Sequence, residues 1–251
     1  MFPFINLGGM EIRTYSLFLT IGIGSCLMIF LIKNTLFPLK IYELIESIPF
    51  ALGFAVLGGK LLSLLTLLPQ VIFKHKIEIK EVFFSIGFVF YGALIGLVVG
   101  LLIESRRKKK ALLSYTDTFF RLLPFGQAIG RIGCYFNGCC YGVETNAWFS
   151  IPYLVNSKSA AVVPTQFIES AFCLVLGVVL LLWQVKIKGF YSAVYLLSYG
   201  FFRFVLEFFR GDEIRGKWFA FSPSQWISGC LVIGCIILIY FNFRTKTRSS
   251  V

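Results

Sequence analysis

Seven long apolar segments dominate this chain, and each is close to the length a helix needs to cross a lipid bilayer. A spanning helix requires roughly 20 consecutive apolar residues. Hydrophobic residues make up 57% of the chain and charged residues only 14%, a balance that soluble domains do not carry. The sequence therefore predicts an all-α polytopic membrane protein with about seven transmembrane helices, at residues 15–33, 45–70, 83–104, 111–130, 164–185, 189–209 and 223–243.

The apolar segments leave little room for a separate soluble domain. We therefore expect residues 1–251 to form a single integral membrane domain. The most polar stretch, residues 143–163, is long enough to form a small cap on the outer side of the membrane. Residues 1–11 lack a basic region typical of a cleavable signal peptide, so we expect the first span to remain in the mature protein.

The positive charge of the chain is unevenly placed. A net charge of +12 can indicate a nucleic-acid partner, but here the lysines and arginines gather in alternate loops, most densely at Arg106–Lys110. Basic residues are enriched in cytoplasmic loops. This pattern predicts that the N-terminus lies outside, that the C-terminus is cytoplasmic and that no nucleic acid is bound. Lys74, Lys76 and Lys80 oppose it, because they fall in a loop predicted to lie outside.

Several polar residues interrupt the apolar segments. An ionised side chain inside a span costs roughly 2.5–3.5 kcal/mol on insertion scales, so it usually persists for a functional reason. Arg203 and Glu207 are four residues apart and share a helix face, which fits either a structural ion pair or an arginine held in position by its glutamate. With Arg131, Arg203 could bind a phosphate, because a guanidinium presents a planar fork to phosphate oxygens.

Three of the seven cysteines cluster after the fourth apolar segment: Cys134, Cys139 and Cys140. They allow three interpretations, namely packing around a close turn, a disulfide in an oxidising outer compartment, or a metal site. Packing is the favoured interpretation. Metal sites usually need four ligands, and no histidine or further cysteine lies nearby in the sequence, so we expect no metal.

The ordered set of motifs resembles the prolipoprotein diacylglyceryl transferase family, and the resemblance covers most of the chain. Its most specific parts are the signature around Gly130-Arg131-Ile132-Gly133 and the later stretch from Tyr199-Gly200 to Arg210. The other matching positions are Tyr15, Gly58-Gly59-Lys60, Tyr91-Gly92, Asn137-Gly138, Gly142, Pro164-Thr165-Gln166 and Glu169.

The resemblance implies a multi-pass enzyme of the bacterial inner (cytoplasmic) membrane. Such an enzyme transfers a diacylglyceryl group from phosphatidylglycerol to the lipobox cysteine of a prolipoprotein, and the product is a thioether. The implied partners are phosphatidylglycerol, the prolipoprotein signal peptide and membrane lipid, and no cofactor or metal is implied. The attacking thiol then belongs to the substrate and not to the cysteine cluster.

The resemblance also assigns residues to roles. The implied catalytic residues are Arg131, Arg203, Glu207 and Tyr91, with the arginines on phosphate, Glu207 orienting Arg203 and Tyr91 handling a proton. Asn137 and Gly142 are expected to shape the signature turn. The implied substrate-binding residues are Arg131, Asn137, Gly142, Tyr15, Gln166, Glu169 and Arg210.

The chain departs from the family at three polar positions. Tyr91 stands where the family carries a histidine, Cys134 where it carries an asparagine and Cys139 where it carries a glutamate. A tyrosine with an unperturbed pKa near 10 is a poor base at neutral pH. The departures leave alternatives open: a divergent relative acting on another lipid or nucleophile, a non-catalytic phospholipid-binding membrane protein, or a redox protein using the clustered thiols.

Overall fold

The computed structural model describes residues 4–7, 10–74, 90–155, 158–211, 222, 224–229 and 232. These residues are mostly helical, as the apolar segments predict. They form two compact units, one made of residues 37–118 and the other of residues 1–36 and 119–251 within the described ranges. The boundary at residue 119 falls inside a helix, so that helix contributes to both units.

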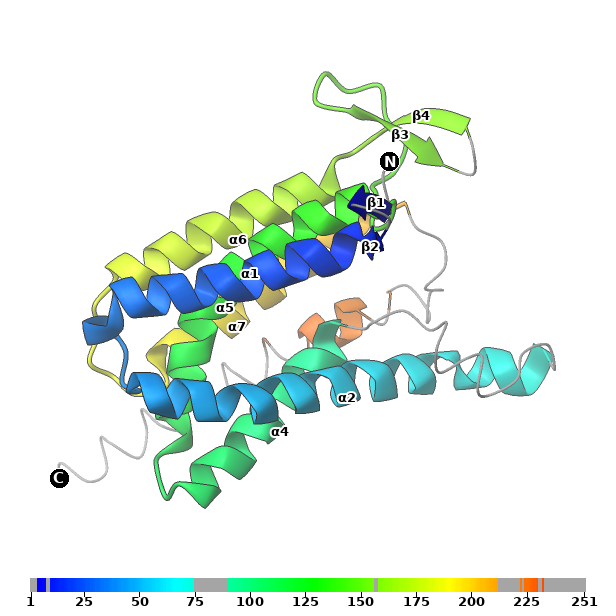
Figure 1. Cartoon of the computed structure of the whole chain (residues 1–251). Coiled ribbons are helices and arrows are strands. Elements are labelled where there is room, and N and C mark those ends of the chain that lie inside the picture. The colour runs from blue at the N-terminus through cyan, green and yellow to red at the C-terminus, as the bar shows by residue number, and fades with distance from the viewer. Residues whose placement is uncertain are drawn as a thin grey trace, which may run out of the picture. The chain divides into compact units, whose positions relative to one another are not determined.

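The unit of residues 37–118 is built on two antiparallel helices, α2 (Ile41–Lys74) and α4 (Phe90–Arg107), which lie side by side (Figure 1). Three glycines of α4 stand four residues apart and face the backbone of α2. A Cβ at Gly92, Gly96 or Gly100 would overlap carbonyl oxygens of α2, at Gly58, Phe54 and Phe50 respectively. These glycines therefore allow α2 and α4 to pack closely, as small residues at this spacing do between helices in lipid.

Ion pairs gather where α4 ends. Glu104 is fully buried and accepts two hydrogen bonds from Arg107, from Nε at 2.7 Å and from Nη2 at 2.9 Å. Lys110 Nζ lies 2.7 Å from the carboxylate of Glu43 near the start of α2. The basic loop after α4 is thus tied to acidic residues of its own unit.

The other unit contains the remaining elements in chain order. A hairpin of β1 (Phe4–Leu7) and β2 (Met10–Arg13) runs directly into α1 (Thr14–Ile32), which is followed by η1 (Asn34–Leu36). The later elements are the C-terminal part of α5 (Leu112–Phe136), β3 (Ile151–Val155), β4 (Lys158–Val162), α6 (Thr165–Leu182), α7 (Phe190–Leu206) and η2 (Glu207–Phe209). Helices α1, α5 and α6 run alongside one another in Figure 1.

Four of the described helical stretches are long and apolar enough to cross a membrane: Thr14–Ile32, Ile41–Leu65, Thr165–Leu182 and Phe190–Phe209. They match four of the predicted spans. Helices α4 and α5 coincide with two more, but both carry charged side chains. The beginning of the 83–104 span and most of the 223–243 span lie outside the described residues, so a total of seven stays a prediction.

Two antiparallel hairpins correct the expectation of a strictly all-α fold. Beside the β1–β2 hairpin, β3 pairs with β4 in a register from Ile151 opposite Val162 to Val155 opposite Lys158. The β1–β2 hairpin precedes the first apolar segment and the β3–β4 hairpin lies between two of them, and neither carries an apolar pattern of helix length. The second hairpin lies within residues 143–163, the stretch predicted to form a cap.

Arg121 ties together the ends of two helical segments. Its side chain is 1% exposed and donates hydrogen bonds to the carbonyl oxygens of Leu36 at 2.5 Å, Leu180 at 3.0 Å and Leu181 at 3.2 Å. The guanidinium also lies over the ring of Tyr191, 4.0 Å from its centroid. The last carbonyls of a helix lack partners within the helix, and a cation there satisfies them. Arg121 therefore fixes the end of α6 against the end of η1.

Candidate functional site

Three helices bring buried charges together at one carboxylate. Arg131 of α5 places Nη2 2.8 Å from Glu169 Oε1 of α6, and Arg203 of α7 places Nη1 3.7 Å from Glu169 Oε2. Arg203 also holds Glu207 Oε2 at 2.5 Å from its Nη2. The Glu169 side chain is 2% exposed and that of Arg131 is 12% exposed. The structure thus joins four of the predicted site residues into one cluster of two cations and two anions, here called the arginine–glutamate cluster.

Tyr199 contacts this cluster, and it is not among the site residues predicted from the sequence. Its hydroxyl donates a hydrogen bond of 2.7 Å to Glu169 Oε1. Tyr199, Arg203 and Glu207 follow one another at intervals of four residues, which puts them on one face of the helix. That spacing is the signal that could have identified Tyr199, because a buried carboxylate needs neutral donors as well as cations.

One donor of the cluster has no hydrogen-bond partner among the described residues. Arg203 is 3% exposed, and its Nη1 makes no hydrogen bond there, since the 3.7 Å distance to Glu169 Oε2 is too long for one. An unsatisfied buried donor costs about 1–3 kcal/mol. The arrangement therefore suits an additional anion that would accept from Nη1.

The signature turn is built by a Schellman motif at the end of α5. Gly138 has φ of 78° and donates its N–H to Tyr135 O at 3.2 Å, while the N–H of Cys139 donates to Cys134 O at 3.2 Å. These are the two bonds that define the motif. The motif sets Cys139 over Cys134, and Cys140 has a positive φ of 66°. As a result, the three sulfur atoms lie within 4.8 Å of one another.

The start of α6 contacts the segment Cys139–Cys140, here called the cysteine turn, from the other side. Gln166 Nε2 donates to Cys139 O at 2.8 Å, and Thr165 Oγ1 donates to Cys140 O at 2.6 Å. Tyr153 of β3 adds a third donor, with its hydroxyl 3.4 Å from Cys139 O. Gln166 was predicted to bind substrate. In the structure Gln166 donates to the cysteine turn, and it lies three residues before Glu169 on α6.

Gly142 does not make the signature turn, which corrects its expected role. Its N–H donates to Val163 O at 3.0 Å, and it bridges to Arg210 on the other side. A Cβ at Gly142 would lie 2.5 Å from Val163 O and 2.8 Å from Phe209 O. The position requires glycine because the backbone at Val163 passes on one side of it and the backbone at Phe209 on the other. The turn itself depends on Gly138.

The environment of Cys140 favours a thiolate. Hydrogen bonds from the thiols of Cys134 and Cys139 hold the pKa of the Cys140 thiol well below its usual range. The positive charges of Arg210 and Arg131 act in the same direction. Arg210 therefore lies within electrostatic reach of the turn, as a predicted substrate-binding residue would.

The remaining predicted residues fall in three places. Asn137 is exposed, with its Nδ2 3.8 Å from Cys139 Sγ. Tyr15, at the start of α1, lies within electrostatic reach of Arg131 and Cys134. Tyr91 is 3% exposed and belongs to α4, in the unit of residues 37–118, whereas the arginine–glutamate cluster belongs to the other unit.

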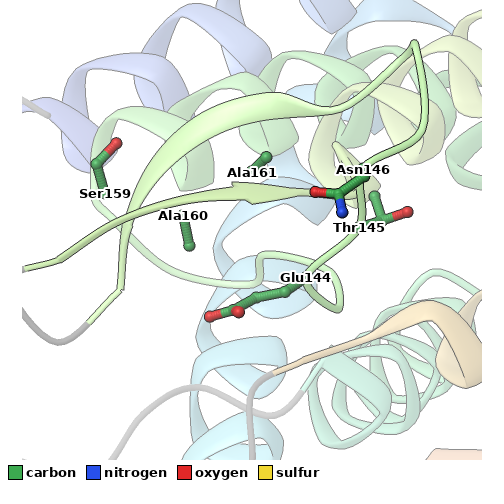
Figure 2. A pocket seen from close by; sticks show the side chains of 6 residues that line it. All are labelled: Glu144, Thr145, Asn146, Ser159, Ala160 and Ala161. Atoms are coloured by element: carbon green, nitrogen blue, oxygen red, sulfur yellow. The ribbon is translucent and has the colours of Figure 1, made fainter.

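A polar hollow of about 400 Å³ lies by the β3–β4 hairpin (Figure 2). Its lining consists of short or exposed side chains: Glu144, Thr145, Asn146, Ser159, Ala160 and Ala161. None of these is a predicted site residue, and the charges of the arginine–glutamate cluster do not line it. The concentration of buried charge, not this hollow, marks the candidate site.

The apolar helices and the buried charges between them are those of a membrane protein with a polar site among its helices. The family model of prolipoprotein diacylglyceryl transferase matches residues 3–241, and the chain belongs to this family. The resemblance that the sequence motifs indicated is thereby confirmed.

Relatives named phosphatidylglycerol–prolipoprotein diacylglyceryl transferase match three quarters or more of this chain. The phosphatidylglycerol–prolipoprotein diacylglyceryl transferase 2 of Clostridium perfringens is 34% identical over 239 residues, which cover 93% of this chain and 92% of the relative. The transferase of Clostridium tetani is 33% identical over 198 residues, covering 76% and 78%. That of Chromobacterium violaceum is 28% identical over 277 residues, covering 96% of each chain.

Proposed function

We propose that this protein transfers a diacylglyceryl group from phosphatidylglycerol to the cysteine thiol of a prolipoprotein. In this reaction a carbon–sulfur bond forms, the bond between the glyceryl carbon and the phosphate oxygen breaks, and glycerol phosphate leaves with the electron pair. The relatives carry the name of this activity. The observation that carries the proposal is the pair of buried arginines on Glu169, because the leaving group is an anion that the enzyme must stabilise.

Arg131 and Arg203 are the residues that bind the phosphate in this proposal. Glu169 holds both guanidiniums, at 2.8 Å and 3.7 Å, so their orientation is set before lipid binds. Arg203 Nη1 supplies a donor without a partner among the described residues. As the ester bond breaks, negative charge grows on the phosphate, and preorganised donors in a low-dielectric site stabilise that charge strongly. Glu207 orients Arg203 through the 2.5 Å contact.

Other residues act around these two arginines. Arg210 and Tyr15 are assigned to substrate binding, because both lie within electrostatic reach of the signature segment. Gln166 and Asn137 act through the cysteine turn that they contact. Gly142 maintains the backbone packing beside Arg210. Tyr91 is assigned to proton handling on the family resemblance of its position.

An apolar hollow of about 420 Å³ next to the signature suits the acyl chains of the lipid. It is lined by side chains of β1, α1 and the end of α5: Phe4, Ile5, Thr14, Leu17, Phe18 and Phe136. Phe18 stacks on Phe136 with ring centroids 5.3 Å apart. Hydrocarbon gains from burial against such side chains. We assign this hollow to part of the diacylglyceryl moiety.

The proposed membrane arrangement is that of a single domain, residues 1–251, with seven spans in the cytoplasmic membrane of a bacterium. The basic loops favour an outer N-terminus and a cytoplasmic C-terminus. This orientation puts the signature turn and the 143–163 cap on the outer side.

The decisive experiment measures the mass of a peptide. The purified protein in phosphatidylglycerol liposomes is incubated with a lipobox peptide, and the peptide is expected to gain one diacylglyceryl group. A peptide with serine in place of the lipobox cysteine should stay unmodified, as should the cysteine peptide in liposomes of phosphatidylethanolamine alone. Transfer from phosphatidylethanolamine alone would favour a relative with another lipid donor. Lipid binding without any transfer would favour the non-catalytic alternative.

A further inference from the structure

The three clustered thiols have the geometry of an incomplete metal site. The sulfur atoms of Cys134, Cys139 and Cys140 all lie within 4.8 Å of one another. In a tetrahedral zinc site with Zn–S bonds of 2.3 Å, two sulfur ligands are separated by roughly 3.8 Å. Small rotations of the side chains would therefore bring the three sulfurs to ligand distance. We refer to these residues as the three-cysteine site.

The backbone that carries these thiols is fixed by two independent sets of contacts. On one side, the Schellman motif at Gly138 stacks Cys139 over Cys134. On the other, Thr165 and Gln166 of α6 donate to the carbonyls of the turn at 2.6 Å and 2.8 Å. The convergence of three thiols is thus a property of an ordered segment. Cysteines that only fill space as small apolar residues would not need their three sulfur atoms so close together.

The surroundings also place polar and cationic groups near the three thiols. Asn137 directs its amide nitrogen toward Cys139 Sγ at 3.8 Å, in the manner of an outer-shell donor to a metal ligand. The charges of Arg210 and Arg131 act on Cys140, and they would offset the excess negative charge of three thiolates around a divalent ion. Thiolate ligands select soft or borderline ions such as Zn²⁺.

We propose that the three-cysteine site binds Zn²⁺ and leaves the fourth coordination position for the thiol of the prolipoprotein cysteine. This proposal rests on the function proposed above. Catalytic zinc sites commonly combine three protein ligands with one open position. Ligand spacing along the sequence predicts no metal, because a fourth ligand from the substrate does not appear in the chain's own sequence.

The chemistry of such a site accounts for the activation of the substrate thiol. A thiol that coordinates Zn²⁺ loses its proton, which passes to water, and the thiolate is the nucleophile. The thiolate sulfur then attacks the glyceryl carbon of phosphatidylglycerol. The new C–S bond replaces the C–O bond, and glycerol phosphate departs with the electron pair. Zinc undergoes no redox change, so no oxidant or reductant is needed.

The location of the site matches this role. Cys134 is three residues after Arg131 on α5, and Gln166, which holds the cysteine turn, is three residues before Glu169 on α6. Residues three apart on a helix lie on one face. The metal would therefore be a neighbour of Arg131 and of its partner Glu169, which lie on these two helices.

Cobalt binding tests the site without any reliance on activity. The purified full-length protein is stripped with a chelator under reducing conditions and titrated with Co²⁺. We expect one ion per chain, with the near-ultraviolet thiolate-to-cobalt band and the visible bands of tetrahedral cobalt. The variant Cys139→Ser should weaken binding by more than about 100-fold, beyond the loss expected for an outer-shell group. Cys26→Ser is the matched control, because Cys26 contacts Leu122 O at 3.3 Å, outside the three-cysteine site. It should titrate as the wild type.

A peptide titration and an activity measurement complete the test. Addition of the lipobox peptide should strengthen the thiolate-to-cobalt band, while the serine peptide should leave it unchanged. Chelated wild-type protein should lose transfer from phosphatidylglycerol at least about 100-fold and regain it with Zn²⁺. Full transfer by metal-free protein would overturn the zinc proposal and leave the transferase function intact. Cobalt and peptide bands without transfer under any condition would support the site and contradict the function. Melting curves of each variant establish that a negative titration does not come from unfolding, and a folded wild type without cobalt bands refutes the site.

Discussion

Arg131 and Glu169 form an ion pair of 2.8 Å between α5 and α6, with the carboxylate side chain only 2% exposed. Glu169 also faces Arg203 and accepts a hydrogen bond from Tyr199. One carboxylate therefore determines the positions of two guanidiniums that come from different helices. The predictions below depend on this arrangement and on the turn beside it.

Removing either arginine should nearly abolish transfer. We expect Arg131→Ala and Arg203→Ala each to lower the rate by about 10²–10³-fold, the usual loss for one electrostatic donor to a developing anion. Arg131→Lys and Arg203→Lys should recover little, because lysine lacks the planar fork. The measurement is the initial rate of diacylglyceryl transfer to the lipobox peptide. Wild-type rates in both alanine variants would refute the assignment of these arginines to the phosphate.

Glu169→Gln should destabilise the protein while keeping its shape. It leaves buried guanidinium charge without compensation, and loss of one partner of a buried pair costs about 3–5 kcal/mol. The thermal midpoint in detergent should fall clearly. The double variant Glu169→Gln with Arg131→Gln should recover much of the stability but remain inactive. Equal midpoints for the single and double variants would contradict the coupling of these two residues.

Gly142→Ala should be strongly destabilising, because the added methyl group would lie 2.5 Å from Val163 O and 2.8 Å from Phe209 O. Overpacking of this kind typically costs about 1–3 kcal/mol. The matched control is Gly130→Ala, since no described atom lies within 4 Å of the position that its Cβ would take. The control should be neutral or stabilising by about 0.5–1 kcal/mol, because Gly130 lies inside a helix. Thermal midpoints compare the two variants, and equal losses would show that Gly142 is not sterically special.

Tyr199→Phe should lower the transfer rate more than removal of another buried tyrosine hydroxyl does. It removes the 2.7 Å hydrogen bond to Glu169, and a hydrogen bond to a charged group contributes about 1.5–3 kcal/mol. Tyr195→Phe is the control, because it removes the 2.8 Å bond to Gln127 Oε1 one helical turn away. Both variants should lose some stability, but only Tyr199→Phe should reduce the transfer rate, by about 10-fold or more. A similar rate in the two variants would remove Tyr199 from the site.

Alkaline phosphatase fusions test the proposed orientation. A fusion within the loop at Ala147 should be active, because that loop is predicted to lie outside, and a fusion after Lys110 should be inactive. The basic segment at Arg106–Lys110 motivates the expectation. The reverse pattern would place the signature turn on the cytoplasmic side and contradict the proposed topology.

Spacing along the sequence predicted contacts within one helix but not contacts between helices. The Arg203–Glu207 pair follows from a separation of four residues, and the structure confirms it at 2.5 Å. The double pairing of Glu169 depends on how α5, α6 and α7 pack, which no local pattern specifies. Glu169 was therefore expected only among the substrate-binding residues, whereas it is the centre of the cluster.

The geometry of the cysteine turn could be predicted only in part from the sequence. Asn137-Gly138 after an apolar helix is a recognisable termination signal, since glycine readily adopts the left-handed conformation that ends many helices. Through the Schellman geometry, this signal predicts the contact between Cys134 and Cys139. The approach of Cys140 could not be predicted in this way, because it depends on the positive φ of a non-glycine residue and on contacts with α6. The β3–β4 hairpin likewise lay in a stretch whose only clear signal was polarity.

Three of the contacts of Arg121 do not depend on which side chains surround it. These hydrogen bonds go to main-chain oxygens, at Leu36, Leu180 and Leu181. A carbonyl is present whatever side chain its residue carries, so substitutions at those leucines leave the bonds available. This part of the anchoring of Arg121 therefore tolerates a change of side chain at its three acceptor positions.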